Sequence, residues 1–363
     1  MTVRLTFDRG TLLVDKMEAL IEGFVFDERI GAFRAKANAY REAFSALHRV
    51  YGESVVDEAR EYGAIEVRFR AHRRPYAHQR EGVQAWMQNG KRGLVVLPTG
   101  SGKTFVAELV IQEISRSTLV IVPTLDLMNQ WYARLLEAFD VAEVGLVGGG
   151  YHELHDLTVT TYDSYSIHAE RLGNRFGLLV FDEVHHLPSA SYAAASQCYI
   201  APFRLGLTAT PEREGEENEA YEDLVGPIVY RQEIKALAGQ HLAEYETRRL
   251  SVPLTTDERE RYVSARGIYT GFLRSSGIRM DGRNGWSEFI MRSSQSRNGR
   301  KAMLAYREQK AIAMSCSKKL ELLEVLLTRH SDGRVIIFTN NNDAVYRISR
   351  RFLIPAITHQ TPI

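Results

Sequence analysis

The sequence predicts an α/β protein built around a doubly wound, mostly parallel sheet. Short apolar runs followed by polar or turn residues support this prediction; they are GLVVL from Gly93, TLVIVP from Thr118, LTVTTY from Leu157, GLLVFDE from Gly177 and FRLGLTAT from Phe203. Helical patterns at 104–116 and 125–139 separate the first of these runs. Apolar strands that alternate with helices are typical of a parallel sheet buried on both faces.

A smaller α+β module is predicted ahead of this sheet, over residues 1–72. Apolar residues alternate in VRLTF, a turn follows at 8–10, and TLLV comes next, which together indicate a hairpin. GFVFDERIGAFRA indicates a second pair of strands. Apolar residues at helical spacing from Tyr40 to Tyr51 predict a helix, for which Gly52 is the expected C-cap.

Composition bounds the class of protein. A chain of 363 residues with 44% hydrophobic content is expected to fold into two or three domains. The chain contains neither a signal-peptide pattern nor an apolar run of membrane-spanning length, so we expect an intracellular, cytoplasmic protein. Cys198 and Cys316 stand far apart without CxxC spacing, which predicts two buried thiols rather than a disulfide or a zinc site.

The formal net charge of +1 hides a strong asymmetry along the chain. Residues 212–223 carry seven acids and one arginine, whereas residues 261–320 carry thirteen Lys or Arg and three acids, a net charge of +10. A basic stretch with interleaved aromatic residues is typical of a surface that grips a nucleic-acid strand. The alternative is that this stretch is only a solvated helical face.

The stretch GLVVLPTGSGKTF predicts a phosphate-binding loop. An apolar strand precedes the loop and a helical pattern starts near Gly102, so the amides of residues 100–104 converge on phosphate oxygens at a helix N-terminus. Lys103 is expected to reach the β- and γ-phosphates of ATP, and the Thr104 hydroxyl is expected to bind Mg²⁺. Leu97 occupies the place of the usual first glycine, which only shapes the entry to the turn.

Two acids follow the apolar run LLVF and predict the second half of a nucleotide site. Asp182 is expected to hold Mg²⁺, and Glu183 to orient and deprotonate the attacking water. The alternative is a solvated acidic turn. One of His185 and His186 is a candidate sensor of the γ-phosphate, although a structural role is equally open for His186.

Taken in order, these motifs resemble those of superfamily 2 helicases, and in particular XPB-type DNA helicases, named for xeroderma pigmentosum group B, of the archaeal and bacterial type. The resemblance rests on PTGSGKT, DEVHH and GLTATPER, with PYAHQREGV ahead of them and VPTLDLMNQW and TTYDS between. It implies a damage-recognition-like module at 1–72, a RecA-like ATP-binding domain at 73–235, a basic thumb-like insertion at 236–315 and the start of a second RecA-like domain at 316–363. In that last part we expect a strand, a helix and a strand.

The resemblance also implies roles for individual residues. The expected nucleotide-binding residues are Gln79, Gly100, Ser101, Gly102, Lys103 and Thr104, with Gln79 reading adenine and Tyr76 stacking nearby. The expected DNA contacts are Pro123, Thr124, Thr161, Tyr162, Arg213, Arg274, Arg279 and Arg283. Thr208 and Thr210 are expected to couple hydrolysis to DNA movement.

The implied activity is ATP-dependent, 3′–5′ opening or translocation of duplex DNA in repair or transcription. Implied partners are DNA, ATP and a nuclease, and the implied location is the cytoplasm, at the nucleoid of a prokaryote. Where the family carries Arg-Glu-Asp, the chain reads Arg-Glu-Gly at 213–215, which leaves the strand-separating role of this loop open. The second motor lobe is expected to be incomplete within the 363 residues. A chain of this length is then expected to hydrolyse ATP poorly alone, and a DNA-binding fragment without turnover is the alternative.

Overall fold

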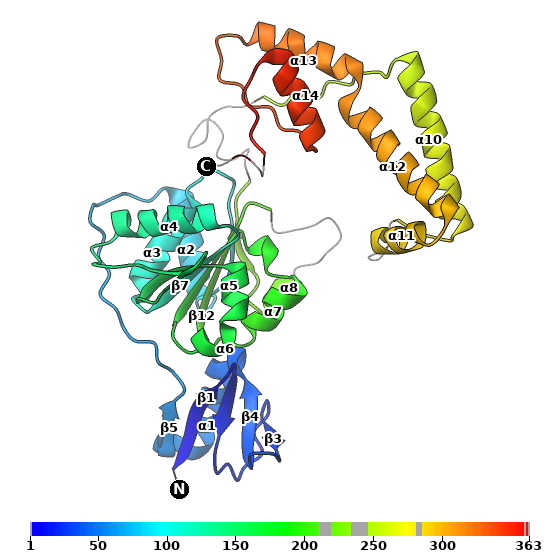
Figure 1. The fold of residues 1–363 in the computed structure, drawn as a ribbon. Helices are drawn as coiled ribbons and strands as arrows, with labels where there is room; N and C mark the ends of the chain where they lie inside the picture. Colours follow the sequence, from blue (N-terminus) through cyan, green and yellow to red (C-terminus); the bar gives the residue numbers. More distant parts are fainter. Residues whose placement is uncertain (1, 211–218, 234–245, 281–284, 359–360, 362–363) are drawn as a thin grey trace. The chain divides into compact units, whose positions relative to one another are not determined.

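The computed structural model describes residues 2–210, 219–233, 246–280, 285–358 and 361. It contains two compact units, Met1–Tyr245 and Glu246–Ile363, and each is described by itself (Figure 1). Across the described part of the chain, no helix has both the length and the apolar character that crossing a membrane requires.

The first unit begins with a small sheet that carries one long helix. Its elements are β1 (Val3–Asp8), β2 (Thr11–Val14), β3 (Val25–Asp27), β4 (Ala32–Lys36), α1 (Tyr40–Tyr51) and β5 (Val55–Glu58). The strand order is β3-β4-β2-β1-β5, and β1 and β2 form the predicted hairpin. Tyr40, Ala43 and Leu47 of α1 lie in the core of this sheet, and α1 is followed by Gly52, whose φ of +55° confirms the expected cap.

The small sheet is fastened to the rest of the first unit. Ile200 lies in the core of the small sheet, and the Asn38 amide donates a hydrogen bond to the Gln197 carbonyl at 3.1 Å. Gly10 has φ +88° and its backbone lies so close to Cys198 that a Cβ would approach the Cys198 Cβ to 2.9 Å. Because Cys198 is only partly buried, the prediction of two buried thiols holds for the other cysteine alone.

The larger sheet of the first unit has eight strands. They are β6 (Arg92–Val96), β7 (Thr118–Val122), β8 (Gly145–Gly148), β9 (Tyr151–Glu153), β10 (Leu157–Thr161), β11 (Leu178–Asp182), β12 (Phe203–Thr208) and β13 (Ile228–Arg231). The order is β13-β6-β12-β11-β7-β10-β8-β9, and every pairing is parallel except that of β8 with β9. The predicted doubly wound parallel sheet is confirmed.

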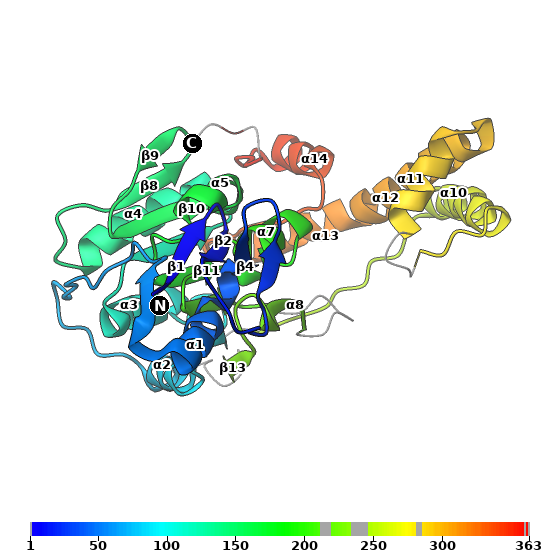
Figure 2. The same cartoon turned by 90° about the horizontal axis from the view of Figure 1, so that it is seen from below.

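Helices cover both faces of this sheet (Figure 1 and Figure 2). One face carries α2 (Ala77–Gln88), α3 (Lys103–Ile114) and α4 (Leu125–Ala138), and the other carries α5 (Tyr162–Ile167), α6 (Ala169–Leu172), α7 (Ala190–Ser196) and α8 (Glu219–Glu222). Neighbouring residues of β6 show the alternation, since Leu94 belongs to one buried cluster and Val95 to the other. This two-sided burial explains why the strands read as continuous apolar runs.

The second unit contains three helices that we call the basic hairpin: α10 (Thr256–Ser275), α11 (Gly285–Ser294) and α12 (Arg297–Ser315). Its core holds Tyr269, Phe289 and Tyr306, and the Tyr269 ring centroid lies 5.3 Å from that of Phe289 and 5.2 Å from that of Tyr306. These three rings therefore pack between the helices, together with Phe272, Leu273 and Ile278, rather than form a strand-gripping surface. Trp286 is 43% exposed, and the expectation for that ring stays a prediction.

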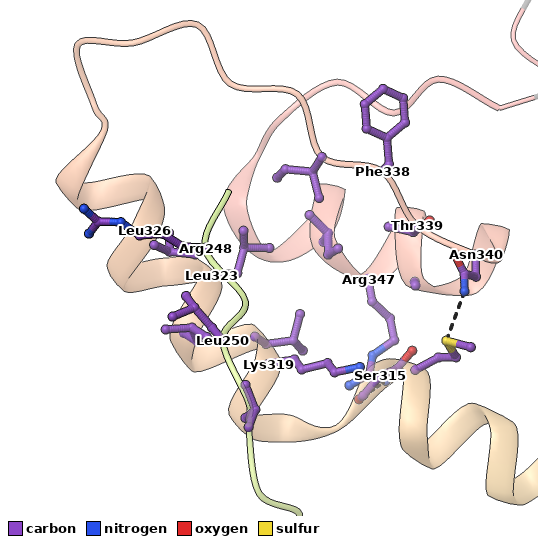
Figure 3. Close-up of a pocket in the computed structure, with 17 residues that line it drawn as sticks. Arg248, Leu250, Ser315, Lys319, Leu323, Leu326, Phe338, Thr339, Asn340 and Arg347 are labelled. Carbon is purple, nitrogen blue, oxygen red and sulfur yellow. Dashed lines mark hydrogen bonds between the residues drawn. The ribbon is translucent and has the colours of Figure 1, made fainter. Parts of the chain in front are cut away.

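The remainder of the second unit is formed by α13 (Ser317–Arg329) and α14 (Asn342–Phe352). The predicted strand at 334–338 is not formed, because the described residues of this unit offer it no strand to pair with. Ile336 and Phe338 are consequently 78% and 90% exposed. A cavity of about 440 Å³ lies beside this segment, with Leu250, Leu323 and Leu326 on its wall (Figure 3).

Candidate nucleotide-binding site

The predicted phosphate loop connects β6 to α3. Gly100 and Gly102 have φ of +82° and +85°, a region that suits glycine, and the loop therefore turns directly into the first turn of α3. The Lys103 ammonium donates a hydrogen bond to the Leu97 carbonyl at 3.3 Å, and the Leu97 amide donates to the Thr208 carbonyl at 3.0 Å. The Leu97 side chain is fully buried, so this position contributes an apolar core contact and a backbone link rather than a glycine turn.

The start of α2 holds the loop from one side. The Gln79 side-chain amide donates to the Ser101 carbonyl at 3.0 Å, and the His78 Nε2 lies 3.0 Å from the same oxygen. The Tyr76 backbone amide donates to the Gln79 Oε1 at 2.9 Å, which satisfies the N–H group just ahead of α2. Since a Cβ at Gly102 would collide with the Gln79 amide, the two segments need a glycine between them.

This packing leaves Gln79 3% exposed, with both ends of its amide bonded to the protein. Gln79 thus holds the phosphate loop in place, and its recognition of adenine stays a prediction. Tyr76 is 52% exposed and its ring stacks on His78 with 5.8 Å between centroids, and its stacking on a base stays a prediction.

Asp182 ends β11 and is held on both carboxylate oxygens. The Trp131 indole N–H donates to Oδ2 at 2.8 Å, and the Glu183 amide donates to Oδ1 at 3.0 Å. The Tyr162 hydroxyl donates to the Asp182 carbonyl at 3.1 Å. Burial raises the pKa of the Asp182 carboxyl above its usual range, and the Trp131 hydrogen bond and the charge of Lys103 oppose that shift.

Glu183 begins a short series of polar contacts towards β12. Its φ is +48°, a strained value for a residue with a side chain, and such values are common at functional sites. The His185 Nδ1 lies 3.4 Å from the Glu183 Oε2 and 3.1 Å from the Thr208 hydroxyl. The Thr208 hydroxyl in turn accepts a hydrogen bond from the Thr210 amide at 3.1 Å.

The donor set at this edge suits Mg²⁺ and a polyphosphate. The Asp182 carboxylate and the Thr104 hydroxyl are hard oxygen ligands, which Mg²⁺ prefers, and Lys103 lies close enough to Asp182 to affect its pKa. The first turn of α3 presents backbone N–H groups that have no partner within the helix, as anion sites at helix N-termini do.

The residues expected to contact DNA differ in their exposure. Thr124 is exposed and caps α4, since its hydroxyl accepts from the Leu127 amide at 3.3 Å, and Pro123 beside it is partly exposed. Thr161 is 7% exposed and caps α5. The Tyr162 side chain is 1% exposed and its hydroxyl supports the backbone of β11, so its ring does not reach DNA, and a contact through its backbone stays a prediction.

Of the arginines predicted to contact DNA, two lie in the second unit and two lie outside the described residues. Arg274 and Arg279 are exposed, Arg274 near the end of α10 and Arg279 after it. Arg213 and Arg283 lie outside the described residues, as does the Arg-Glu-Gly sequence at 213–215.

Several residues of this region were not anticipated from the sequence. Trp131 and His78 lie within motifs that carried the resemblance, but no role was expected for either residue, and both contact predicted site residues. Glu108 of α3 is fully buried and forms ion pairs with Arg73 and, at 2.6 Å, with Arg134 of α4. An acid inside the apolar stretch FVAELVI was the one available signal for this cluster.

Two family models match the first unit. Residues 5–59 match the damage recognition domain of the xeroderma pigmentosum group B helicase, and residues 72–213 match the res subunit of type III restriction enzymes. The DNA 3′-5′ translocase XPB2 of Sulfurisphaera tokodaii is 39% identical over 362 residues, which are 99% of this chain and 80% of that protein. The chain belongs to the XPB-type helicases of superfamily 2.

Other XPB-type proteins match over shorter stretches. The putative DNA 3′-5′ helicase Rad25 of Haloarcula marismortui is 33% identical over 210 residues, 56% of this chain and 33% of that protein. The DNA 3′-5′ helicase XPB of Kineococcus radiotolerans is 33% identical over 204 residues, 53% of this chain and 36% of that protein. The family membership agrees with the motifs from which the resemblance was first inferred.

Proposed function

We propose that this protein is an ATP-dependent DNA 3′–5′ helicase or translocase that acts in DNA repair or transcription. The observation that carries the proposal is the bonded edge of the eight-stranded sheet. The phosphate loop, the Asp182–Glu183 pair and the Thr208–Thr210 segment lie at the carboxyl ends of β6, β11 and β12, which are neighbours in the sheet. Ligands of doubly wound sheets bind at this edge.

The roles of the loop residues follow from charge and geometry. The loop amides and the N-terminus of α3 would hold the phosphates of ATP, and Lys103 would move from the Leu97 carbonyl to the β- and γ-phosphates. Thr104 and Asp182 would hold Mg²⁺, which neutralises phosphate charge as the terminal phosphoryl group leaves. Glu183 would accept a proton from the attacking water and align that water with the phosphorus.

The chain of contacts from Glu183 supports a coupling role for Thr208 and Thr210. His185 is placed between the Glu183 carboxylate and the Thr208 hydroxyl, so a displacement of Glu183 during hydrolysis changes the contacts of β12. Thr208 is fully buried and Thr210 is exposed. A movement that starts at the nucleotide therefore has a route of polar contacts to the surface.

DNA is the expected partner on two grounds. The helix caps at Thr124 and Thr161 follow strands at the same edge of the sheet, and helix N-termini bind phosphate groups. The basic hairpin of the second unit adds exposed arginines. Attachment to the nucleoid and a nuclease partner remain predictions from the family resemblance.

A strand-displacement assay tests this proposal. The full-length protein should remove a labelled strand from a DNA duplex or the third strand from a DNA triplex. Displacement should require ATP and Mg²⁺, should fail with a non-hydrolysable analogue, and should be lost in Glu183→Gln while that variant still binds ATP. Displacement by Glu183→Gln at the wild-type rate would show that the site has been assigned to the wrong residues.

A further inference from the structure

The middle of α4 touches the nucleotide site through one side chain. Trp131 is 3% exposed and packs in the core between α4 and the sheet, and its indole N–H donates to the Asp182 Oδ2 at 2.8 Å. The same helix begins at Thr124, and three residues after Trp131 it places Arg134 on the buried Glu108 of α3. Helix α4 is thus bonded to the aspartate of β11 and to the helix that follows the phosphate loop.

The hydrogen bond restricts the orientation of the Asp182 carboxylate. A carboxylate has two oxygens and about four lone-pair positions, of which the Trp131 indole takes one on Oδ2 and the Glu183 amide takes one on Oδ1. Donors on both oxygens fix the plane of the group, and each oxygen keeps a lone pair for another ligand. Trp131 is a rigid donor because its ring is enclosed by the core.

We propose that Trp131 is a positioning residue that orients the Asp182 carboxylate for Mg²⁺ and so sets the affinity of the site for the metal in the presence of nucleotide. The proposal rests on the function proposed above. Donors that orient a metal ligand commonly change metal affinity 10–100-fold when they are removed. Trp131 touches neither metal nor nucleotide in this proposal and acts only through Asp182.

The chain supplies a matched control for this hydrogen bond. Trp86 of α2 is fully buried in the same core cluster, and its indole N–H donates to the Arg204 carbonyl at 2.9 Å. Trp86→Phe and Trp131→Phe each remove one buried indole and one hydrogen bond of nearly equal length. Only the second removes a donor from a predicted metal ligand, so general loosening of the core affects both variants alike.

The experiment measures binding of a fluorescent ATP analogue to the full-length protein while free Mg²⁺ is varied. In Trp131→Phe, the free Mg²⁺ concentration that gives half-maximal binding should rise about 10–100-fold. Trp86→Phe should match the wild type, and all three proteins should bind the analogue equally in EDTA. An unchanged Mg²⁺ dependence in Trp131→Phe, or an equal shift in both variants, would overturn the proposal. If the wild type shows no Mg²⁺-dependent nucleotide binding, the proposed function itself fails.

A second measurement keeps Trp131 in place, in case Trp131→Phe does not fold. The sequence contains three tryptophans, so Trp86→Phe combined with Trp286→Phe leaves Trp131 as the single indole. With nucleotide bound, addition of Mg²⁺ should change the emission of Trp131, and Asp182→Asn should abolish that response. Constant emission during a Mg²⁺-dependent rise in nucleotide binding would contradict the proposed link.

Discussion

The carboxyl edge of the eight-stranded sheet and the basic hairpin of the second unit use polar side chains in opposite ways. At the sheet edge, Asp182 is 8% exposed, Thr208 is fully buried, and each has defined hydrogen-bond partners. In the basic stretch of the second unit, Arg274 and Arg279 are exposed, and the core between the helices is mainly apolar and aromatic. The first region depends on geometry and the second on the amount of positive charge.

This difference predicts different responses to substitution and to salt. Buried polar groups have no water to replace a lost partner, so removal of one partner leaves the other unsatisfied. Exposed charges are hydrated and screened, with a Debye length of about 8 Å at physiological ionic strength. Effects at the sheet edge should therefore be large and specific to one side chain, and effects on the basic hairpin should be graded and sensitive to salt.

The largest expected effect is the loss of stability when a buried glutamate that pairs with arginine is removed. An exposed glutamate that also pairs with arginine provides the contrast. Glu108 has a fully buried side chain between Arg73 and Arg134, whereas Glu288 of α11 has a 34% exposed side chain and pairs with Arg292 at 2.6 Å. Glu108→Ala should lower the free energy of unfolding by about 3–5 kcal/mol, because it leaves two arginines facing a buried gap. Glu288→Ala should cost at most about 1 kcal/mol. Equal losses of unfolding free energy in the two variants, measured by chemical denaturation, would contradict the difference between the buried and the exposed ion pair.

The next effect concerns turnover. Lys103→Ala should reduce ATP hydrolysis by the full-length protein at least about 10²–10³-fold, since the charge it places on the phosphates has no substitute nearby. Its unfolding midpoint should stay close to that of the wild type, because among the described residues the ammonium hydrogen-bonds to the Leu97 carbonyl alone. Retention of most activity, measured by steady-state phosphate release with DNA present, would reject the loop assignment.

The basic hairpin should show graded losses. Arg274→Ala and Arg279→Ala should each weaken DNA binding similarly on unrelated sequences and reduce the slope of log affinity against log salt by about 0.7–0.9 per lost phosphate contact. Arg261→Ala is the control, because its guanidinium already pairs with Glu308 at 3.0 Å. A fall in affinity with an unchanged slope would mean that the two arginines support structure rather than bind phosphate.

The smallest effect is expected for Tyr162→Phe, which keeps the buried ring and removes the hydroxyl that donates to the Asp182 carbonyl. The free energy of unfolding should fall by about 1 kcal/mol. Affinity for DNA, measured by fluorescence anisotropy, should not change, since the side chain is buried. A loss of DNA affinity larger than the loss of stability would restore a direct contact for this residue.

The sequence predicted the sheet well because its signals are local. Apolar runs marked β6, β7, β10, β11 and β12, and each expected motif of the nucleotide site falls where one of these runs ends or just beyond it. The strands β8, β9 and β13 were missed. β8 has glycine at both ends, β9 is three residues long and exposed, and β13 is only four residues long.

Contacts between distant segments were the part that sequence could not supply. The bond from Trp131 to Asp182 spans 51 positions, and no periodicity encodes it. Tyr162 matched a DNA-contacting position of the family, yet its pattern gave no indication of which way the ring points. The segment 334–338 has the composition of a strand, but a strand forms only where another strand pairs with it.

The central claim is that the bonded edge of the sheet joins ATP hydrolysis to DNA. The most direct test is the ratio of ATP turnover with and without duplex DNA for the wild-type protein and for Thr208→Val, which keeps the shape of the buried residue and removes the hydroxyl bonded to His185 and Thr210. DNA should stimulate ATP turnover of the wild type, and Thr208→Val should still bind ATP but lose most of this stimulation. Wild-type ATP turnover that does not change with DNA, or full stimulation of Thr208→Val by DNA, would contradict the claim.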